Sequence, residues 1–498
     1  MLILFFNSFL NMKIGFNNGK YLKIQSEHIK ERIAQFGDKL YLEFGGKLFD
    51  DFHASRVLPG FEPDSKLKML MQLKDDAEII IVISAKDIEK NKIRGDLGIT
   101  YDVDVLRLRE VFLSRGLKVG SIVITHFNGQ ASAMAYRKRL ERMGVKVYYH
   151  YTIEGYPTNV ELIDSDEGFG KNDYVATSRP LVVVTAPGPG SGKMAVCLSQ
   201  LYQDHQRGIK AGYAKFETFP IWSIPLKHPI NLAYEAATAD LNDINMIDPF
   251  HLEAYGKTAV NYNRDIEIFP VLNAIFEGIY GKNPYKSPTD MGVNMAGFCI
   301  SDDEVCCKAS HDEIIRRYYT ALCNLADGKS TENEINKIAL LMKQAKISID
   351  DRKTTIAAKE KQEQTGVHAA AIELADGTII TAKTSALLGP SAALLLNATK
   401  HLAGIEHALK LIPQNMIEPI QKTKVSYLHG NNPRLHTDEV LVALSILSLH
   451  DENCKKALDC LPLLKGCQIH TTVMLSEVDQ KIFKKLGIGL TSEPVKKG

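Results

Sequence analysis

The chain has 498 residues, of which 45% are hydrophobic and 24% charged, a composition typical of a soluble globular protein with about two to four domains. Its 60 lysines and arginines nearly balance its 59 aspartates and glutamates, so it lacks the basic excess that marks nucleic-acid binding. The eight cysteines include no C-x-x-C pair, and we expect reduced thiols in a cytoplasmic protein.

The first eleven residues, MLILFFNSFLN, are apolar but have no basic region before them and no small-residue cleavage site after them. A stretch of about ten residues is too short to cross a bilayer. Met12 is followed by Lys13 and is a more natural start, so we expect residues 1–11 to be an upstream extension. No other stretch is long and apolar enough to span a membrane, and we expect no membrane partner.

Apolar runs and amphipathic segments alternate through the first half of the chain. The pattern predicts strands at 40–44, 78–83, 121–125, 145–149, 181–184 and 211–216, and helices at 26–36, 101–116, 131–144 and 194–208. This alternation implies a parallel sheet with right-handed crossovers. We therefore predict an α/β fold in which residues 12–230 form a P-loop-like or Rossmann-like parallel sheet domain.

The composition changes after Thr218, where a proline-rich loop contains the single tryptophan, Trp222. Helices are predicted at 232–241 and 249–260, with 263–273 as a connecting segment. Helical patterns then dominate from residue 269 to about 346, including 314–325 and 332–345. We predict a mainly helical domain or insertion over residues 231–346.

In the last part of the chain, a hairpin pattern is followed by alternating helical and strand patterns, which predicts a C-terminal α/β subdomain over residues 347–498. Residues 354–364 are charged and resemble a linker, and the turn ADG at 375–377 predicts a β-hairpin of 368–374 with 378–384. Helices are predicted at 391–401, 436–449 and 477–486, and a strand at 467–475.

The stretch LVVVTAPGPGSGKM, residues 181–194, carries the strongest functional signal. A buried strand leads into a glycine-rich turn, a lysine and a helix, which are the parts of a phosphate cradle. We expect Lys193 to neutralise phosphate charge. The residues expected to contact the ligand are Thr185, Gly188, Gly190, Ser191, Gly192 and Lys193.

This stretch departs from the P-loop pattern G-x-x-x-x-G-K-[ST] at two positions. Pro187 takes the place of the first glycine, and Met194 takes the place of the hydroxyl that would hold Mg²⁺. Three interpretations stay open: a nucleotide-phosphate site with unusual metal handling, an anion site for another phosphorylated or carboxylated ligand, and a turn without a ligand. The lysine favours the first two, because a cation at a helix N-terminus opposes the helix dipole.

Two further polar residues fall at the end of the predicted strand 211–216. Lys215 and Glu217 would lie near the carboxyl edge of the sheet, beside the cradle, where open α/β sheets bind ligands. We take both as candidate catalytic residues, with Glu217 as a base or metal ligand. A solvated strand end explains them equally well.

The strings EFGGKLFDDFHASRVLPGF, VVVTAPGPGSGKM, NLAYEAATADLND and SPTDMGVNMAGF occur in this order. From about residue 12 to the C-terminus, the chain resembles a bacterial family filed as a domain of unknown function, number eighteen forty-six. The resemblance implies a bacterial cytoplasmic protein with the three parts given above. Some members carry the label of ATP-dependent zinc protease, but this chain lacks the H-E-x-x-H motif, and we expect no zinc.

The C-terminal part is also similar in layout to the cytidine-deaminase-like fold, with a hairpin followed by a glycine-containing turn and a helix. The zinc signature H-x-E…P-C-x-x-C is absent, which disfavours deaminase chemistry. His429, Arg434 and His436 would line a substrate pocket there, although a capped loop before a helix explains this segment as well.

The leading hypothesis is an enzyme that binds ATP, another nucleotide or another small phosphorylated ligand at the glycine turn. Its reaction class would be phosphoryl transfer or ATP-driven ligation, with the use of Mg²⁺ left open. A second hypothesis is a non-catalytic binding or scaffold protein that uses the turn for a regulatory anion. A third is a transferase acting on a nucleotide-like substrate in the C-terminal pocket. We expect no nucleic-acid partner and leave a homo-oligomer open.

Overall fold

The computed structural model describes residues 13–37, 39–49, 51–95 and 97–496, so the proposed extension at residues 1–11 lies outside the described part. The chain divides into two compact units. One comprises residues 15–234 and 243–306, called here the sheet unit. The other contains residues 235–242 and 307–498 and is called the C-terminal unit.

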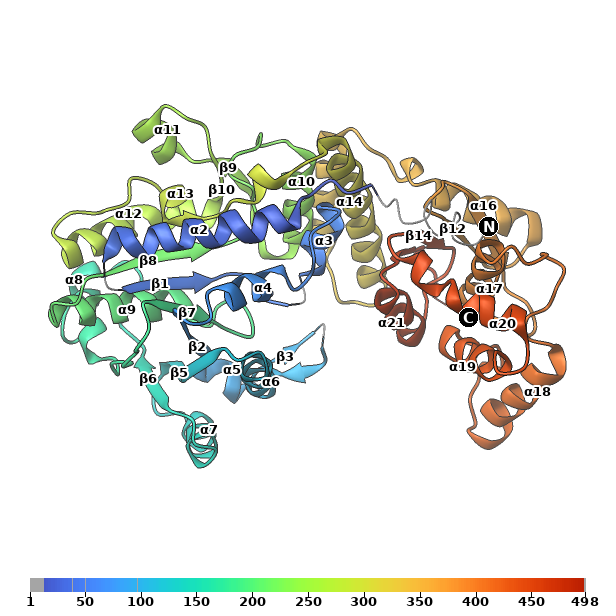
Figure 1. Cartoon of the computed structure of the whole chain (residues 1–498), viewed down its shortest axis with the longest axis horizontal. Coiled ribbons are helices and arrows are strands. Elements are labelled where there is room, and N and C mark those ends of the chain that lie inside the picture. The colour runs from blue at the N-terminus through green and yellow to red at the C-terminus, as the bar shows by residue number, and fades with distance from the viewer. Residues whose placement is uncertain (1–12, 38, 50, 96, 497–498) are drawn as a thin grey trace. The chain divides into compact units, whose positions relative to one another are not determined.

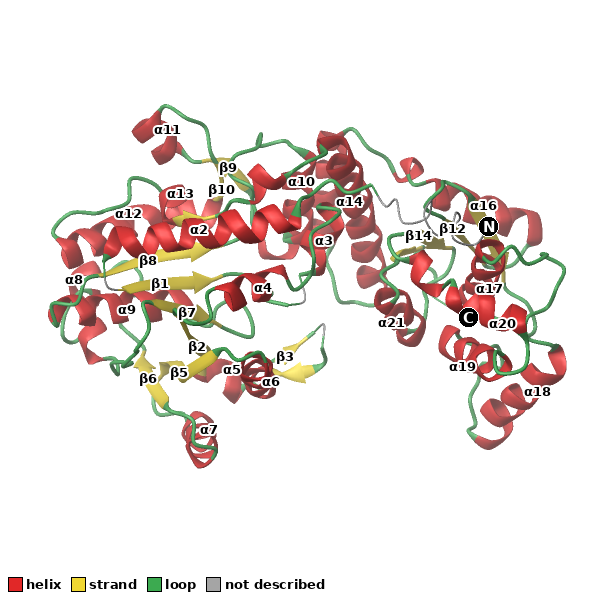
Figure 2. Ribbon diagram, in the orientation of Figure 1, coloured by secondary structure: helices red, strands yellow, loops and turns green. Residues whose placement is uncertain are grey.

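A seven-stranded sheet forms the centre of the sheet unit (Figures 1 and 2), with the strand order β11-β8-β1-β7-β2-β5-β6. All neighbouring strands are parallel. The strands are β1 (Lys39–Phe44), β2 (Ala77–Ser84), β5 (Lys118–Phe127), β6 (Val147–Tyr151), β7 (Leu181–Thr185), β8 (Ala211–Phe216) and β11 (Gly292–Val293). The predicted α/β class with a parallel sheet is therefore confirmed.

Helices cover both faces of this sheet. On one face, Tyr41 of β1 donates a 2.7 Å hydrogen bond to Asp204 of α9 (Lys193–Gln206). Tyr213 of β8 lies on the same face beside a phenylalanine of α12 (Asn263–Tyr280), with ring centroids 6.0 Å apart. On the other face, Gly212 lets the Phe36 ring of α2 (Asn18–Phe36) pack directly against β8, since a Cβ would collide with that ring.

The sheet unit also contains further helices and two small ribbons. The helices are α3 (Phe52–Val57), α4 (Ser65–Gln72), α5 (Ala85–Glu89), α6 (Tyr101–Ser114), α7 (Ala131–Arg142), α8 (Val160–Ile163), α11 (Pro249–Tyr255) and α13 (Pro288–Met291), with α10 (Pro229–Ala237) beginning in this unit. Two small ribbons pair β3 (Ile93–Arg94) with β4 (Ile99–Thr100) and β9 (Asn245–Ile247) with β10 (Val260–Tyr262).

The structure corrects two expectations here. The helix predicted at 249–260 ends at Tyr255, because Gly256 adopts a left-handed conformation that terminates helices, and Val260 belongs to strand β10. The segment 263–273, predicted to be a connection leading into a helical region from residue 269, lies wholly inside α12, which begins at Asn263. Its apolar residues at helical spacing, among them Phe269, Leu272 and Phe276, are buried in the core of the sheet unit.

The C-terminal unit contains a four-stranded sheet in the order β13-β12-β14-β15. The strands are β12 (Ala369–Glu373), β13 (Ile379–Lys383), β14 (Gln468–Thr471) and β15 (Gly489–Ser492). The predicted hairpin is confirmed as the antiparallel pair β12–β13. The helices are α15 (Glu332–Ala345), α16 (Lys353–Thr365), α17 (Pro390–Leu402), α18 (Gln414–Lys422), α19 (Thr437–Leu447), α20 (Glu452–Asp459) and α21 (Glu477–Lys485), and most of α14 (Asp303–Ala326) also belongs here.

The segment 354–364 is the clearest difference in this unit. Its charged composition suggested a linker, but it forms helix α16 and packs against β12 and β13. Small residues of the helix, Thr354, Thr355 and Ala358, are buried. Across the described residues, no helix combines the length and the apolar character needed to cross a membrane.

Candidate active site

The glycine turn, residues 186–192, joins the carboxyl end of β7 to the first residue of α9 in the middle of the parallel sheet. Thr185 is buried at the end of the strand. Gly188 packs so closely against the ring of Tyr101 that a Cβ would collide with it. Gly192 has a φ of +85°, which favours glycine, and it is the residue from which α9 begins.

Hydroxyl groups hold the turn in one shape. Ser191 is buried, and its Oγ donates a 2.6 Å hydrogen bond to the carbonyl of Gly188. The carbonyl of Ser191 in turn accepts a 2.6 Å hydrogen bond from Oγ1 of Thr125, at the end of β5. The Ser191 hydroxyl, expected to bind the ligand, therefore already has an acceptor inside the turn.

The N-terminus of α9 is left open for an anion. Among the described residues, no acceptor takes the backbone N–H groups of Gly192, Lys193, Met194 and Ala195. The helix has no side-chain cap and no acidic residue in its first turn, so the positive end of its dipole is uncompensated. Lys193 is partly buried and forms no ion pair within the described chain.

A cavity of about 130 Å³ lies against this helix end and is called here the α9 cavity. Its walls come from the carboxyl ends of β5 and β6, from the following loop and from the start of α9. They are formed by Thr125, His126, His150, Tyr151, Ile153, Tyr156, Asn172, Gly192, Met194 and Ala195. The volume suits a phosphate-sized group, whereas drug-sized ligands occupy roughly 300–1,000 Å³. Lys193 is not part of the wall.

His150 is a buried residue in the wall of the α9 cavity. The side chain is only 3% exposed, and its Nε2 lies 3.2 Å from the amide nitrogen of Gln200. Because that amide can only donate, Nε2 accepts and Nδ1 carries the proton. Nδ1 is buried and makes no hydrogen bond of good geometry within the described residues, although the backbone of Asp173 acts on the ring in the direction that raises its pKa. Burial lowers the pKa of His150 to about 3, so the imidazole stays neutral.

Lys215 and Glu217 belong to a buried charged group, called here the lysine cluster, at the carboxyl end of β8. Nζ of Lys215 contacts both carboxylate oxygens of Asp265, at 2.7 and 2.6 Å. It also lies 3.1 Å from Oε1 of Glu217 and donates to the hydroxyl of Tyr262. The ammonium thus lies among carboxylate and hydroxyl oxygen atoms, and its positive charge offsets the negative charge of the two carboxylates.

Glu217 is the member of the lysine cluster whose pKa is shifted toward neutral pH. Its Oε1 accepts a 2.6 Å hydrogen bond from the hydroxyl of Tyr262, and 25% of its side chain is exposed. Burial raises the pKa of Glu217 to about 7 despite the attraction of Lys215, with the negative charge of Asp265 acting in the same direction as burial. A carboxyl group with such a pKa can take up and release a proton at neutral pH.

Glu43 connects the lysine cluster with the glycine turn. It pairs in register with Val184 of β7 on one side and with Lys215 of β8 on the other. Strand β1 therefore lies between the two sites, and Lys215 and Glu217 are not directly beside the turn. Two strand spacings of about 4.8 Å separate β8 from β7, or about 10 Å.

Sequence reasoning did not identify Glu43, and it left Asp265 and Tyr262 without a role. A signal for Glu43 existed, since it is the one charged residue within the predicted strand 40–44 and lies two positions before Gly45. Asp265 and Tyr262 are distant from Lys215 in sequence and reach it only through the fold around β10 and α12.

The structure separates the three candidates of the C-terminal unit. Nδ1 of His436 lies 3.0 Å from Oδ2 of the buried Asp479. Arg434 is exposed and donates through Nε to the carbonyl of Ser385, and His429 is an exposed turn residue. The three side chains therefore have separate surroundings, and a substrate pocket there stays a prediction.

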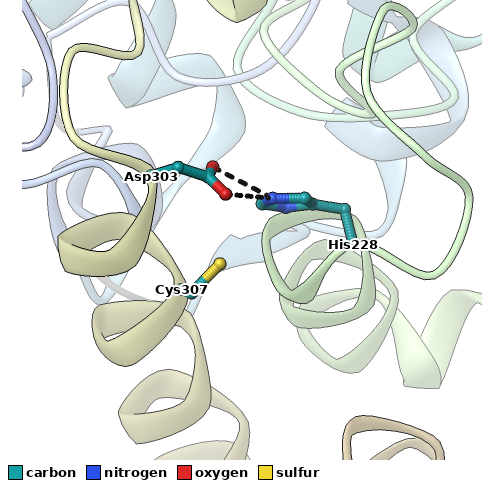
Figure 3. Close-up of side chains that lie close together, drawn as sticks. All are labelled: His228, Asp303 and Cys307. Carbon is teal, nitrogen blue, oxygen red and sulfur yellow. Dashed lines mark hydrogen bonds and ion pairs between the residues drawn. The ribbon is translucent and has the colours of Figure 1, made fainter.

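A further contact of the sheet unit joins the loop before α10 to the start of α14. Nε2 of His228 lies 3.0 Å from Oδ1 of Asp303, whose side chain is 61% exposed, and Cys307 follows one turn later on the same helix (Figure 3). His228 and Asp303 do not belong to strands of the parallel sheet.

Comparison with known proteins identifies the family. Residues 14–346 match the domain described as "Domain of unknown function DUF1846, N-terminal", and residues 350–497 match its C-terminal counterpart. The chain is 57% identical over 482 residues to a UPF0371 protein of Corynebacterium urealyticum, with 97% of each chain covered. It is 56% identical over 483 residues to a UPF0371 protein of Streptococcus uberis, covering 97% of this chain and 98% of that protein. The chain therefore belongs to the bacterial DUF1846 family.

Proposed function

We propose that the sheet unit binds the phosphate group of a small phosphorylated molecule in the α9 cavity. The observation that carries the proposal is the set of unused donors around this cavity. Four backbone N–H groups of α9 and the buried Nδ1–H of His150 make no hydrogen bond of good geometry within the described residues. Unsatisfied buried donors are costly, and an anion at a helix N-terminus would satisfy them.

Lys193 would add charge from the edge of the site. It stands at the first helical position, has no carboxylate partner in the described chain, and its long side chain leaves the ammonium free to approach a bound phosphate. The strand, turn, lysine and helix support a P-loop-like assignment. Met194, which lines the cavity in the place of the usual hydroxyl, favours anchoring by N–H groups over the P-loop manner of holding Mg²⁺.

The lysine cluster supports an enzyme over a scaffold protein. Glu217 follows β8, and the α9 cavity lies at the ends of β5 and β6, so Glu217 would act on a part of the ligand that extends from the cavity across the carboxyl ends of the intervening strands. There it would accept the proton of an attacking hydroxyl or amine, as phosphoryl transfer and ligation both require. A purely structural ion pair has no need of a partly exposed carboxyl group that titrates near neutral pH.

Titration calorimetry with inorganic phosphate, and separately with ATP, tests the binding step. His150→Phe and Lys193→Met should each weaken binding about 10- to 100-fold, the value of one lost hydrogen bond to a charged group or of one ionic contact. Lys227→Met is the matched control, since Lys227 is exposed in a loop of the same unit. Equal affinities for wild type, His150→Phe and Lys193→Met would exclude the site.

The catalytic step needs a separate readout. Mass spectrometry of small molecules that co-purify with the protein would name the ligand to be used in turnover assays. Glu217→Gln should then keep the affinity for that ligand within about threefold and lose at least 100-fold in turnover, in the range of general acid–base contributions. Tight binding without any turnover by the wild type would instead support the scaffold hypothesis.

A further inference from the structure

The C-terminal unit contains a second, larger cavity beside the edge strand β13. It has a volume of about 420 Å³ and is called here the β13 pocket. Helices α16 and α17 both pack against β13, and the residues after α17 complete the wall. Its lining consists of Lys361, Ile379, Ile380, Thr381, Asn397, Lys400, His401, Ile405 and His407. The size falls in the range of small-molecule sites.

The charged residues of the lining are all basic. Lys361 comes from α16, Lys400 and His401 from the last turns of α17, and His407 from the following loop, and the lining includes no carboxylate. Asp376 lies outside the lining, close enough to His401 for their charges to interact, and its carboxylate is held by the backbone N–H of Thr378. The pocket therefore carries an excess of positive charge.

Lys400 is the central group. Only 8% of it is exposed, and its ammonium donates to the carbonyls of His407 at 2.8 Å and Leu409 at 3.2 Å. A third N–H is left, and no carboxylate pairs with the ammonium in the described chain. Burial lowers the pKa of Lys400. A buried charge without a counter-charge is costly, and a bound anion would offset that cost.

We propose that the β13 pocket binds a small molecule with two or more negative charges, a phosphate ester or a polycarboxylate. Lys400 would hold the first negative group at the base of the pocket. Lys361, His401 and His407 would surround the rest of the ligand. Asn397 donates through its amide nitrogen to the carbonyl of Thr381, which leaves its side-chain oxygen to accept a hydroxyl of the ligand.

Titration calorimetry on the full chain tests the proposal, with pyrophosphate and citrate as the two probes. A double variant, His150→Phe with Lys193→Met, serves as the starting protein, so that binding at the α9 cavity is weakened at both of its proposed side-chain contacts. We expect at least one probe to bind, and Lys400→Met to weaken its binding at least tenfold. Lys410→Met, which changes an exposed lysine in the loop after α17, should leave the affinity unchanged. Tighter binding of pyrophosphate would assign a phosphate ester, and tighter binding of citrate a polycarboxylate.

Lys361→Met provides a second route, since Lys361 is only partly buried and its replacement leaves the interior intact. It should weaken binding about three- to tenfold whether or not Lys400→Met folds. The proposal is overturned if neither probe binds at 10 mM. It is also overturned if Lys361→Met and a folded Lys400→Met bind as tightly as the starting protein. Because Lys361 and Lys400 lie outside the α9 cavity, the comparison of their variants with the starting protein is independent of the proposed function.

Discussion

The hydroxyl of Tyr213 donates a 2.7 Å hydrogen bond to Oε2 of Glu43, and both groups are buried between the parallel sheet and its covering helices. The charge of Glu43 contributes to the raised pKa of Lys215 on one side, after Asp265 and Glu217. On the other side it contributes to the rise in the pKa of Tyr156 to about 12, which is caused mainly by burial. Glu43 therefore acts electrostatically on both the lysine cluster and the wall of the α9 cavity.

Removing the Tyr213 hydroxyl should destabilise the protein. In Tyr213→Phe, the buried Glu43 loses a donor, and an unsatisfied buried acceptor costs about 1–3 kcal/mol. We expect the free energy of unfolding in urea to fall by this amount. Tyr148→Phe is the control, because Tyr148 is also on the sheet, is partly buried and makes no hydrogen bond through its hydroxyl in the described chain. An equal effect of the two substitutions would contradict the assigned role.

The pH dependence of stability should report Glu217. Its pKa is raised from 4.5 to about 7, so the folded carboxyl group binds a proton more tightly than the unfolded one. This contribution to stability is present below pH 4.5 and is lost as the pH rises through 7. Between pH 5 and 8, the wild type should lose about 2 kcal/mol of unfolding free energy relative to Glu217→Gln. Parallel pH profiles for the two proteins would show that Glu217 does not titrate in this range.

A second buried carboxylate should prove structural. Asp204 of α9 is fully buried and accepts from Nζ of Lys39 at 2.9 Å and from the hydroxyls of Tyr41 and Tyr174, each at 2.7 Å. Asp204→Ala leaves a buried ammonium without its partner, which should cost about 3–5 kcal/mol of stability. Asp75→Ala, at an exposed turn, should cost less than about 0.5 kcal/mol. Thermal or urea unfolding distinguishes the two.

The parallel sheet could be predicted because its strands, apart from β11, are mostly apolar segments that alternate with helical patterns. The run EIIIVI lies within β2, and the prediction for 211–216 matches β8 residue for residue. Burial on both faces makes such runs nearly continuous in apolar character, which is a local signal. Strand β11 has only two residues and depends on its pairing with β8, so the sequence contains little evidence of it.

The site could be predicted only in part. The glycine turn is visible because its strand, glycines, lysine and helix are adjacent in sequence. The lysine cluster and the α9 cavity are not, because Lys215 meets Asp265 fifty positions away and His150 meets Gln200 at the same separation. Helix α16 was missed for a related reason. Most of its residues are polar or charged, and only a few small residues are buried, so the sequence has no clear apolar face. The helix packs against β12 and β13, a contact that the sequence pattern does not reveal.

The most direct test of the central claim is a phosphate titration followed through the backbone amide signals of ¹⁵N-glycine-labelled protein. The account predicts that the Gly192 signal shifts with phosphate concentration, since its N–H is one of the donors at the N-terminus of α9. Gly256, which ends α11 in the same unit, is the internal control and should not shift. A saturating phosphate concentration that leaves the Gly192 signal in place, or moves it no more than that of Gly256, would contradict phosphate binding at α9.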